Sequence, residues 1–372
     1  MNLLDRYLAR EILLPLSAAL LFLTQLLLAT QLLSQATLLF GAGVRLGEVG
    51  LVILYLLPYF VAFILPVAFL LGVVLGVSRL AGDRELVAMG AAGLSPLRLL
   101  RVPLLLSLVA GALGVWLSLF LEPAGMRAVR GLINDMVRRN VSSEVRPGIF
   151  FDQIPGFTLY AERVEGGEWG NVLIQDRSNP DAPVLSLSRR GRLEPVGAGQ
   201  EMRLGLKDGE LHREDVRSDE YALATYETAQ LVLGLGGGFA ERTEGLGRNA
   251  RAVTLAETRQ EIAEAYAQGK PDRAWYIEGN LHRKIASALV VLCFALLGVP
   301  LGASARAGRA FGAGATLFVV VGHYILLRAG QIVTQKGTVP AWLGLELGNA
   351  VVAAIGLLLL WRLARRGMGA VR

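Results

Sequence analysis

The stretch SRLAGDRELVAMGAAGLSPLRLLR, residues 78–101, decides how this chain is organised. It connects two long apolar runs and is itself rich in charge, which is typical of a segment between two membrane spans. Its pattern predicts a short helix over about residues 83–92, with Asp83 as the N-cap and Gly93 as the left-handed residue after the last turn. The dipeptide Ser95-Pro96 then fits the N-cap and first position of the next helix.

This short helix has two interpretations. Four arginines in the stretch place it on the cytoplasmic side of a membrane, and Glu85 lies in its first turn, where the helix dipole favours negative charge. A capped helix lying across the inner face of the membrane is suited to receive force from a soluble partner. In the alternative interpretation, it is a re-entry turn whose charges only set the topology. The local sequence leaves both interpretations open.

The composition indicates a membrane protein. Of the 372 residues, 53% are hydrophobic and only 18% are charged, whereas soluble domains carry roughly 25% charged residues. The net charge of +6 comes from arginines gathered at the ends of apolar runs, so it indicates membrane topology and not a nucleic-acid surface. The single cysteine, Cys293, lies inside an apolar run and excludes a disulfide within the chain.

Six apolar runs are long enough to cross a membrane. They cover about residues 12–33, 49–77, 102–121, 285–301, 311–330 and 342–360. Arginines are concentrated in the segments that share one side with both termini, so the sequence predicts a multi-pass protein with cytoplasmic termini. Three spans belong to residues 1–122 and three to residues 281–372. The second run contains Gly72 and Gly76, a spacing that lets helices approach closely.

The segment between these two groups, residues 123–280, has a different pattern. Apolar and polar residues alternate over residues 157–161, and the short runs that follow are separated by glycine, proline and asparagine turn signals. Regularly spaced strands of this kind predict an all-β sandwich or jelly roll on the side opposite the termini. A glycine-rich linker covers residues 234–251, and Thr254 and Glu257 form a capping box that opens a soluble helix.

No motif for catalysis occurs in the chain. The pattern G-x-x-x-x-G-K-[ST] is missing, so the sequence predicts no phosphate-binding loop and no ATPase of its own. No cluster of His, Cys and Asp has the spacing of a metal site. We therefore expect no catalytic residue, no metal and no cofactor in this chain.

Cations near the ends of the spans opposite the termini are candidates for contacts with lipid phosphates. Arg328 lies within a span, where a cation is costly to hold. The other candidates flank the spans on the same side, and they are Arg45, Arg283, Lys284 and Lys336. In the alternative interpretation, these side chains only anchor the helices at the lipid interface.

Three spans, a β domain and three more spans form an unusual order, and local motifs add to it. The runs LPVAFLLGVVLGVSRLAGDRELVAMGAAGLSP (residues 65–96), PGIFFDQIPGFTLYAERVEGGEWGNVLIQD (147–176) and LHRKIASALVVLCFALLGVPLG (281–302) resemble hallmark segments of the lipopolysaccharide export permeases LptF and LptG. The resemblance covers essentially the whole chain and is slightly closer to LptF at the exit of the fourth span. It implies a membrane α-helical protein with six transmembrane helices and an inserted periplasmic jelly roll.

The resemblance also implies a function, that of a permease subunit of an ABC transporter in the bacterial inner membrane. Such a subunit pairs with a sister permease and binds a cytoplasmic LptB ATPase dimer, which uses ATP. Together they extract lipopolysaccharide and pass it to LptC/LptA-type bridge proteins in the periplasm. By position, the residues that couple to the ATPase are those of the short helix, Asp83, Arg84, Glu85 and Met89. The β-domain residues expected to contact lipid include Phe157 and Leu159.

One departure from the family concerns the first span. The family often carries lysines or arginines near the outer end of this span, where Gln31 and Gln35 stand here, so the positive charge must come from the cations named above. Two other classes of function stay open, an ATPase-independent lipid transporter or scramblase and a structural membrane anchor for the β domain. Binding of a nucleotide-binding subunit by residues 78–101 distinguishes the permease from the ATPase-independent transporter. A structural anchor would leave Arg328 and the glycines between the spans dispensable.

Overall fold

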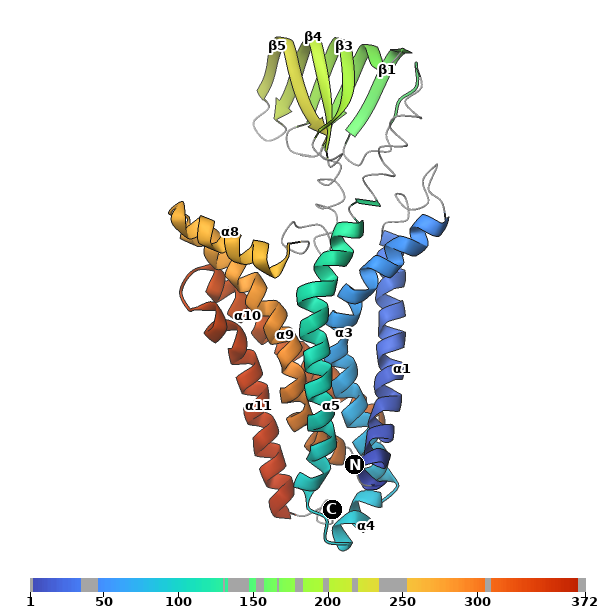
Figure 1. Cartoon of the computed structure of the whole chain (residues 1–372), viewed down its shortest axis with the longest axis vertical. Helices are drawn as coiled ribbons and strands as arrows, with labels where there is room; N and C mark the ends of the chain where they lie inside the picture. Colours follow the sequence, from blue (N-terminus) through green and yellow to red (C-terminus); the bar gives the residue numbers. More distant parts are fainter. Residues whose placement is uncertain are drawn as a thin grey trace. The chain divides into compact units, whose positions relative to one another are not determined.

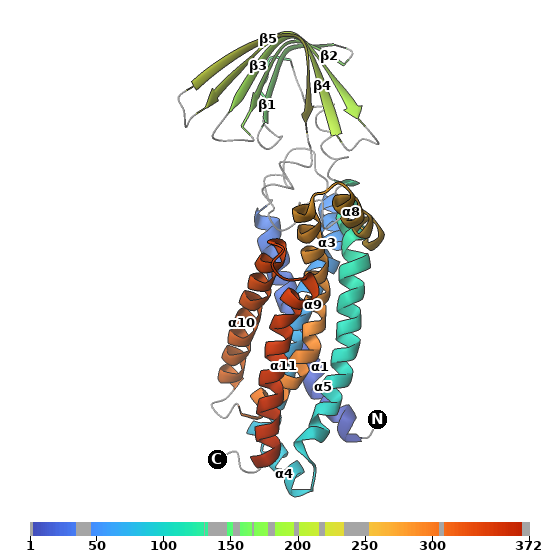
Figure 2. The same ribbon diagram turned by 90° about the vertical axis from the view of Figure 1, so that its left-hand side faces the viewer.

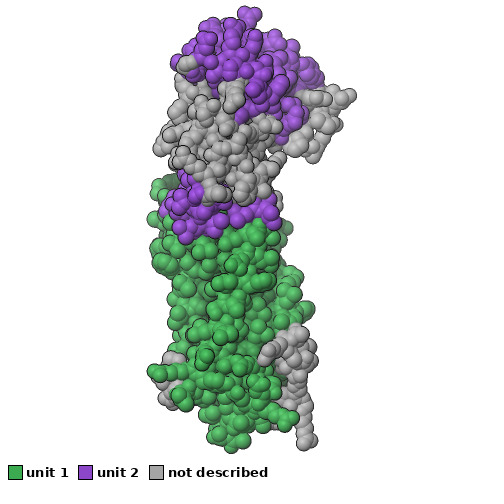
Figure 3. All heavy atoms as spheres, turned by 90° about the vertical axis from the view of Figure 1, so that its right-hand side faces the viewer, with its two compact units in different colours: residues 1–31, 56–125, 253–372 green, residues 32–55, 126–252 purple. Residues whose placement is uncertain are grey.

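The computed structural model describes residues 3–34, 46–129, 131–132, 147–151, 157–165, 167–177, 183–196, 201–215, 220–233, 253–304 and 309–366. The chain divides into two compact units (Figure 3). The first unit comprises residues 1–31, 56–125 and 253–372, and the second comprises residues 32–55 and 126–252.

Six helices among the described residues are long and apolar enough to cross a membrane, which confirms the six predicted spans. They are α1 (Leu3–Ser34), α3 (Leu46–Gly82), α5 (Pro96–Trp116), α9 (Pro271–Ala303), α10 (Arg309–Gln335) and α11 (Ala341–Arg366). The helix α5 continues through a π-helical turn, η1 (Leu117–Leu121). In the first unit these helices run side by side, and α1 begins and α11 ends near the short helix α4 (Glu85–Ala91) (Figures 1 and 2). We call this the α4 end of the bundle.

The helix α3 forms the core of the bundle because it is apolar on all sides. Two thirds of its most apolar window, 67%, is buried, against 17% for α1. Two of its glycines pack directly against α1. A Cβ atom added at Gly76 would lie 2.6 Å from the backbone oxygen of Glu11, and one added at Gly72 would lie 2.6 Å from the Cβ atom of Leu16. The predicted close approach at this pair of glycines is therefore confirmed.

The soluble helix α8 (Leu255–Ala267) lies at the other end of the first unit and packs against α9 (Figure 1). Its predicted capping box is confirmed, because the Glu257 backbone N–H donates to the Thr254 hydroxyl at 3.3 Å and the Thr254 N–H donates to the Glu257 carboxylate at 2.7 Å. The Tyr266 hydroxyl donates to Glu278 of α9 at 3.1 Å. Burial and this carboxylate raise the pKa of Tyr266 above its ordinary value.

The second unit contains a five-stranded antiparallel sheet, which confirms the predicted β domain. Its strands are β1 (Phe157–Glu165), β2 (Glu168–Asp176), β3 (Val184–Val196), β4 (Glu201–Asp215) and β5 (Glu220–Leu233). Each strand pairs with the next along the chain, in the order β1-β2-β3-β4-β5. The described strands thus form one meander, and the jelly-roll topology stays a prediction.

A crease crosses all five strands of the sheet. The ladder pairing is interrupted at one residue in each strand, and these residues are Glu162, Asn171, Arg189, Asp208 and Glu227. Asn171 and Asp208 have positive φ angles of 47° and 54°, a conformation that asparagine and aspartate tolerate better than other side chains. Figure 2 shows that the sheet is bent. The five neighbouring residues without ladder pairing explain where the strands bend.

The apolar core of the sheet lies on one face, which we call the inner face. It includes Leu159, Ala161, Val172, Ile174 and Leu204, all nearly or fully buried. Along an ordinary strand, side chains on one face recur every two residues. Across the crease the spacing between inner side chains is three residues, as in the pairs Ala161 and Val164, Trp169 and Val172, and Tyr226 and Ala229. The crease therefore keeps the apolar side chains on the same face while the strands change direction.

Candidate coupling helix and lipid-contact residues

The start of α4 differs from the sequence prediction. Asp83 was predicted as its N-cap, and this is wrong, because Arg84 occupies the N-cap position with φ 60° and no side chain of a described residue caps the first turn. The physical reason is that α3 stays helical through Gly82. Asp83 thus lies one turn beyond Arg79, whose carbonyl accepts its backbone N–H at 2.9 Å, and the two side chains approach to 3.7 Å.

The end of α4 agrees with the sequence prediction. Gly93 has φ +80°, its N–H donates to the Gly90 carbonyl at 3.0 Å, and the N–H of Leu94 donates to the Met89 carbonyl at 3.0 Å. This pair of bonds is the Schellman motif, which a left-handed glycine permits. Ser95 follows in an extended conformation and Pro96 opens α5. Two tight turns therefore fix both ends of α4 across the end of the bundle.

The carboxylate of Glu85 has an internal partner that the sequence did not reveal. The hydroxyl of Tyr7 in α1 donates to it and lies 3.0 and 2.8 Å from its two oxygens. Leu86 is buried in the core of the bundle and Met89 packs partly against it. Of the four residues predicted to couple to an ATPase, Asp83 and Arg84 are exposed, whereas Glu85 and Met89 are half-buried.

An exposed apolar surface lies beside these charged residues. Val87 of α4 and Leu97 at the start of α5 keep 48% and 58% of their surface exposed. The described residues around α4 thus offer both apolar and charged contacts, the combination found in protein interfaces.

Two ion pairs accompany the Tyr7 contact. Arg98 of α5 lies 3.0 Å from Asp5, and Arg79 of α3 lies 2.8 Å from Glu11. Asp5 and Glu11, like Tyr7, belong to the first turns of α1. Sequence reasoning missed these pairs because each joins residues far apart in the chain. The only available signal was the number of polar residues at the start of an otherwise apolar helix.

Lys284, a predicted phosphate contact, forms an internal ion pair with Glu122. Its Nζ atom lies 3.2 Å from the Glu122 carboxylate, and only 12% and 6% of the two side chains are exposed. The same nitrogen lies 3.4 Å from the backbone oxygen of Ser118. The Glu122 carboxylate and the Ser118 carbonyl are therefore partners of this ammonium group, for which the sequence indicated none.

The π-helical turn explains why the Ser118 oxygen accepts from Lys284. In this turn the Glu122 N–H donates to the Leu117 carbonyl, one residue further back than in an α-helix. The corresponding donor for Ser118 would be residue 123, which is a proline and has no N–H. The sequence Glu122-Pro123 thus leaves one carbonyl free, and the ammonium group of Lys284 approaches it.

The remaining predicted cations occupy different places. Arg328 is exposed on α10, and its guanidinium donates to Gln331 at 3.0 Å, while Gln331 donates to Asn280 of α9 at 3.0 Å. Arg283 is half-buried on α9, and Lys336 is exposed in the turn after α10. Arg45 lies outside the described residues.

The sheet places one of its two predicted lipid contacts on the inner face. Leu159 is fully buried there, whereas the side chain of Phe157 lies outside the part of the chain that the structure describes. The Tyr226 hydroxyl lies 2.6 Å from the Ser186 hydroxyl and 2.5 Å from that of Ser188. These three hydroxyls place polar groups on the inner face beside its apolar core.

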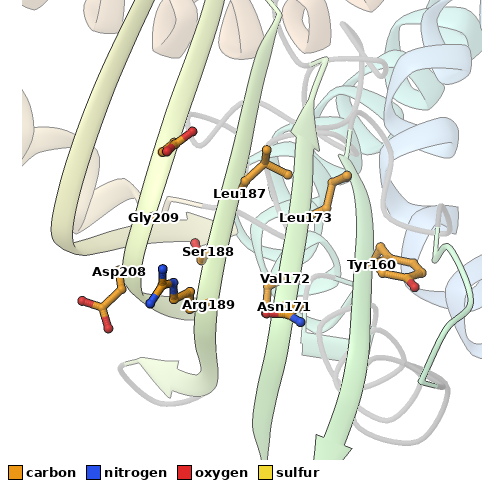
Figure 4. A pocket seen from close by; sticks show the side chains of 10 residues that line it. Tyr160, Asn171, Val172, Leu173, Leu187, Ser188, Arg189, Asp208 and Gly209 are labelled. Atoms are coloured by element: carbon orange, nitrogen blue, oxygen red, sulfur yellow. The ribbon is translucent and has the colours of Figure 1, made fainter.

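The opposite face carries a shallow groove of about 430 Å³ across β1 to β4 (Figure 4). Tyr160, Leu173 and Leu187 are register neighbours along it. Phe150 extends this row, because its ring lies 4.8 Å from that of Tyr160. The sheet therefore has apolar side chains on both faces, but the buried core is confined to the inner one.

Comparison with known proteins gives one match over the length of the chain. The family model described as lipopolysaccharide export system permease LptF/LptG matches residues 6–362. No curated protein sequence matches the chain. The family model covers LptF and LptG together, so the slight similarity to LptF stays a prediction.

Proposed function

The chain belongs to the lipopolysaccharide export permease family LptF/LptG, and we propose on this premise that it is a membrane subunit of an ABC transporter. It pairs with a sister permease and an LptB ATPase dimer, extracts lipopolysaccharide from the inner membrane, and passes it to an LptC/LptA-type bridge. Both termini and α4 lie in the cytoplasm, and the sheet lies in the periplasm. The distribution of arginine supports this orientation.

The observation that carries this proposal is the position of α4. The helix lies at one end of the bundle, is fixed by a turn at each end, and exposes Val87, while Asp83 and Arg84 are exposed just before it. A re-entry turn that only set topology would need neither a regular helix nor an exposed valine on it. We assign this surface to the ATPase. The sequence contains no phosphate-binding loop motif, so the energy for transport comes from this partner.

An apolar contact surface on α4 can be tested by adding a charge to it. Val87→Asp is expected to weaken binding of the ATPase about tenfold or more, because a carboxylate would be buried at the interface without a partner. The measurement is the amount of ATPase that copurifies with the permease at increasing salt. The control is Ala256→Asp, at an exposed position of the soluble helix α8. Copurification of Val87→Asp at the level of the control would remove α4 from the ATPase interface. Only a wild-type chain that retains no ATPase would favour the ATPase-independent transporter.

For the lipid we propose two contact regions. The cations Arg328, Arg283 and Lys336, with Arg45, contact phosphates where lipid enters; Arg328 is the first choice because it is exposed on a span. Lys284 contributes less, since its charge is already paired with Glu122. The acyl chains then follow the inner face of the sheet, whose side chains are apolar at Leu159 and its neighbours.

Photo-crosslinkers placed along β1 and β2 test this path. We expect lipid adducts at inner positions such as Ala161, Val164, Trp169 and Val172, and fewer at Tyr160 and Leu173 on the opposite face. The labelled positions should be two residues apart within each arm of the sheet and three apart across the crease. Labelling that keeps a period of two through Asn171, or that favours Tyr160 and Leu173, would contradict passage along the inner face.

A further inference from the structure

The first turns of α1 are joined to the segment around α4 by three polar contacts. Tyr7 donates to Glu85 at 2.8 Å, Asp5 pairs with Arg98 at 3.0 Å, and Glu11 pairs with Arg79 at 2.8 Å. One contact thus reaches each of α4, α5 and α3. We call Asp5, Tyr7 and Glu11, with these partners, the α1 clasp.

The spacing of these residues along α1 explains how one helix makes all three contacts. At about 100° per residue, Tyr7 and Glu11 lie on one flank, Asp5 lies on the other, and Leu8 and Ile12 lie between them. Leu8 and Ile12 are buried in the core of the bundle. The clasp is therefore an apolar stripe with polar contacts on both flanks, which fixes the rotation of α1 as well as its position.

The rest of α1 is held much less firmly. Its most apolar window is only 17% buried, the lowest share of the six candidate spans among the described residues. Large side chains further along it, such as Leu21 and Phe22, are more than half exposed. A helix that is held at one end and packs little against the rest of the chain along its length changes its position or tilt as a unit when the held end is displaced.

We infer that the α1 clasp transmits displacement of α4 to α1. The inference rests on the proposed binding of the ATPase at α4. Glu85 links α4 directly to α1, while Asp5 and Glu11 hold the same turns of α1 to the helices on either side. Movement of α4 on ATP binding therefore changes the position of the span least enclosed by protein. Tyr7 and Asp5 are positioning residues, and the apolar surface at Val87 is the docking site.

Two variants test the transmission. Tyr7→Phe removes only the hydroxyl that binds Glu85, and Asp5→Asn removes the charge that faces Arg98. We expect the combined variant to bind the ATPase and hydrolyse ATP as the wild type does, but to export about tenfold less lipopolysaccharide per ATP. Reversing the second pair, as Asp5→Arg with Arg98→Asp, should restore export relative to Asp5→Arg alone. The matched control is Tyr324→Phe, at an exposed tyrosine of α10.

A spectroscopic measurement separates transmission from folding. A spin label at exposed Leu21 of α1 should change its mobility on addition of ATP in the wild-type complex and not in the combined variant. The inference is overturned if the combined variant keeps the wild-type ratio of export to hydrolysis, or if it loses ATPase binding, which would place the clasp in docking. Failure of the wild-type chain to bind the ATPase would instead overturn the proposed function itself.

Discussion

Glu122→Gln is expected to lower the free energy of unfolding by about 3–5 kcal/mol, the cost of removing one partner from a buried ion pair. The Glu122 carboxylate lies 3.2 Å from the Lys284 ammonium, and both side chains are almost fully enclosed. Glutamine has nearly the same shape as glutamate, so the variant removes the negative charge without leaving a cavity. The lost stability then measures the cost of leaving the Lys284 charge buried, with the Ser118 carbonyl and the substituted amide as its neighbours.

The size of this effect depends on the π-helical turn. Because Pro123 has no N–H, the Ser118 oxygen lacks its backbone donor, and Lys284 approaches it at 3.4 Å. Lys284→Met would therefore leave both the Glu122 charge and this oxygen without a donor. We expect it to destabilise the protein at least as much as Glu122→Gln.

The midpoint of thermal unfolding in detergent micelles measures both losses. Glu122→Leu combined with Lys284→Met should recover most of the stability, since an apolar pair of similar volume avoids the buried charge. The control is Glu261→Gln on the soluble helix α8, where the carboxylate is outside the bundle. Unchanged midpoints in the single variants would contradict a buried ion pair between Lys284 and Glu122, and Lys284 would then be as available for phosphate as the other cations.

Much of the fold follows from local sequence patterns. Each span is an apolar run of sufficient length, so six helices were predictable without knowledge of their packing. The left-handed Gly93, the start of α5 at Pro96 and the capping box at Thr254 depend on residues next to one another in the chain, and all three are confirmed. The alternation around Leu159 predicted a strand with one apolar face for the same reason.

Features that depend on distant residues were not predictable. Asp83 has the side chain of an N-cap, but the length of α3 decides that it does not act as one. Lys284 and Glu122 are each unremarkable in sequence, and only the packing of α9 against α5 joins them. The crease requires the same interruption in five separate strands, which no single strand reveals. The contact between Tyr7 and Glu85 joins residues 78 positions apart.

The helices α10 and α11 approach each other closely at two glycines, and this contact gives the second large effect. A Cβ atom added at Gly330 of α10 would overlap the backbone oxygen of Gly344 in α11. A backbone atom cannot move aside as the end of a side chain can, so the two helices would have to separate. Gly344 is also restricted, because its own added Cβ would overlap the Thr334 hydroxyl and would lie 3.0 Å from the backbone oxygen of Gly330.

Gly330→Val is therefore expected to destabilise the protein by about 3 kcal/mol or more, at or beyond the upper end for overpacked cores. Gln331, the next residue of α10, is buried and donates to Asn280 of α9 at 3.0 Å, so a shift of α10 would also disturb this contact. The matched control is Gly322→Val in the same helix, where an added Cβ meets no described atom within 4 Å. Resistance to protease in detergent and the unfolding midpoint distinguish the two variants. If Gly330→Val unfolds at the same temperature as Gly322→Val, the backbones of α10 and α11 do not approach as closely as the structure has them, and α10 is free to move against α11.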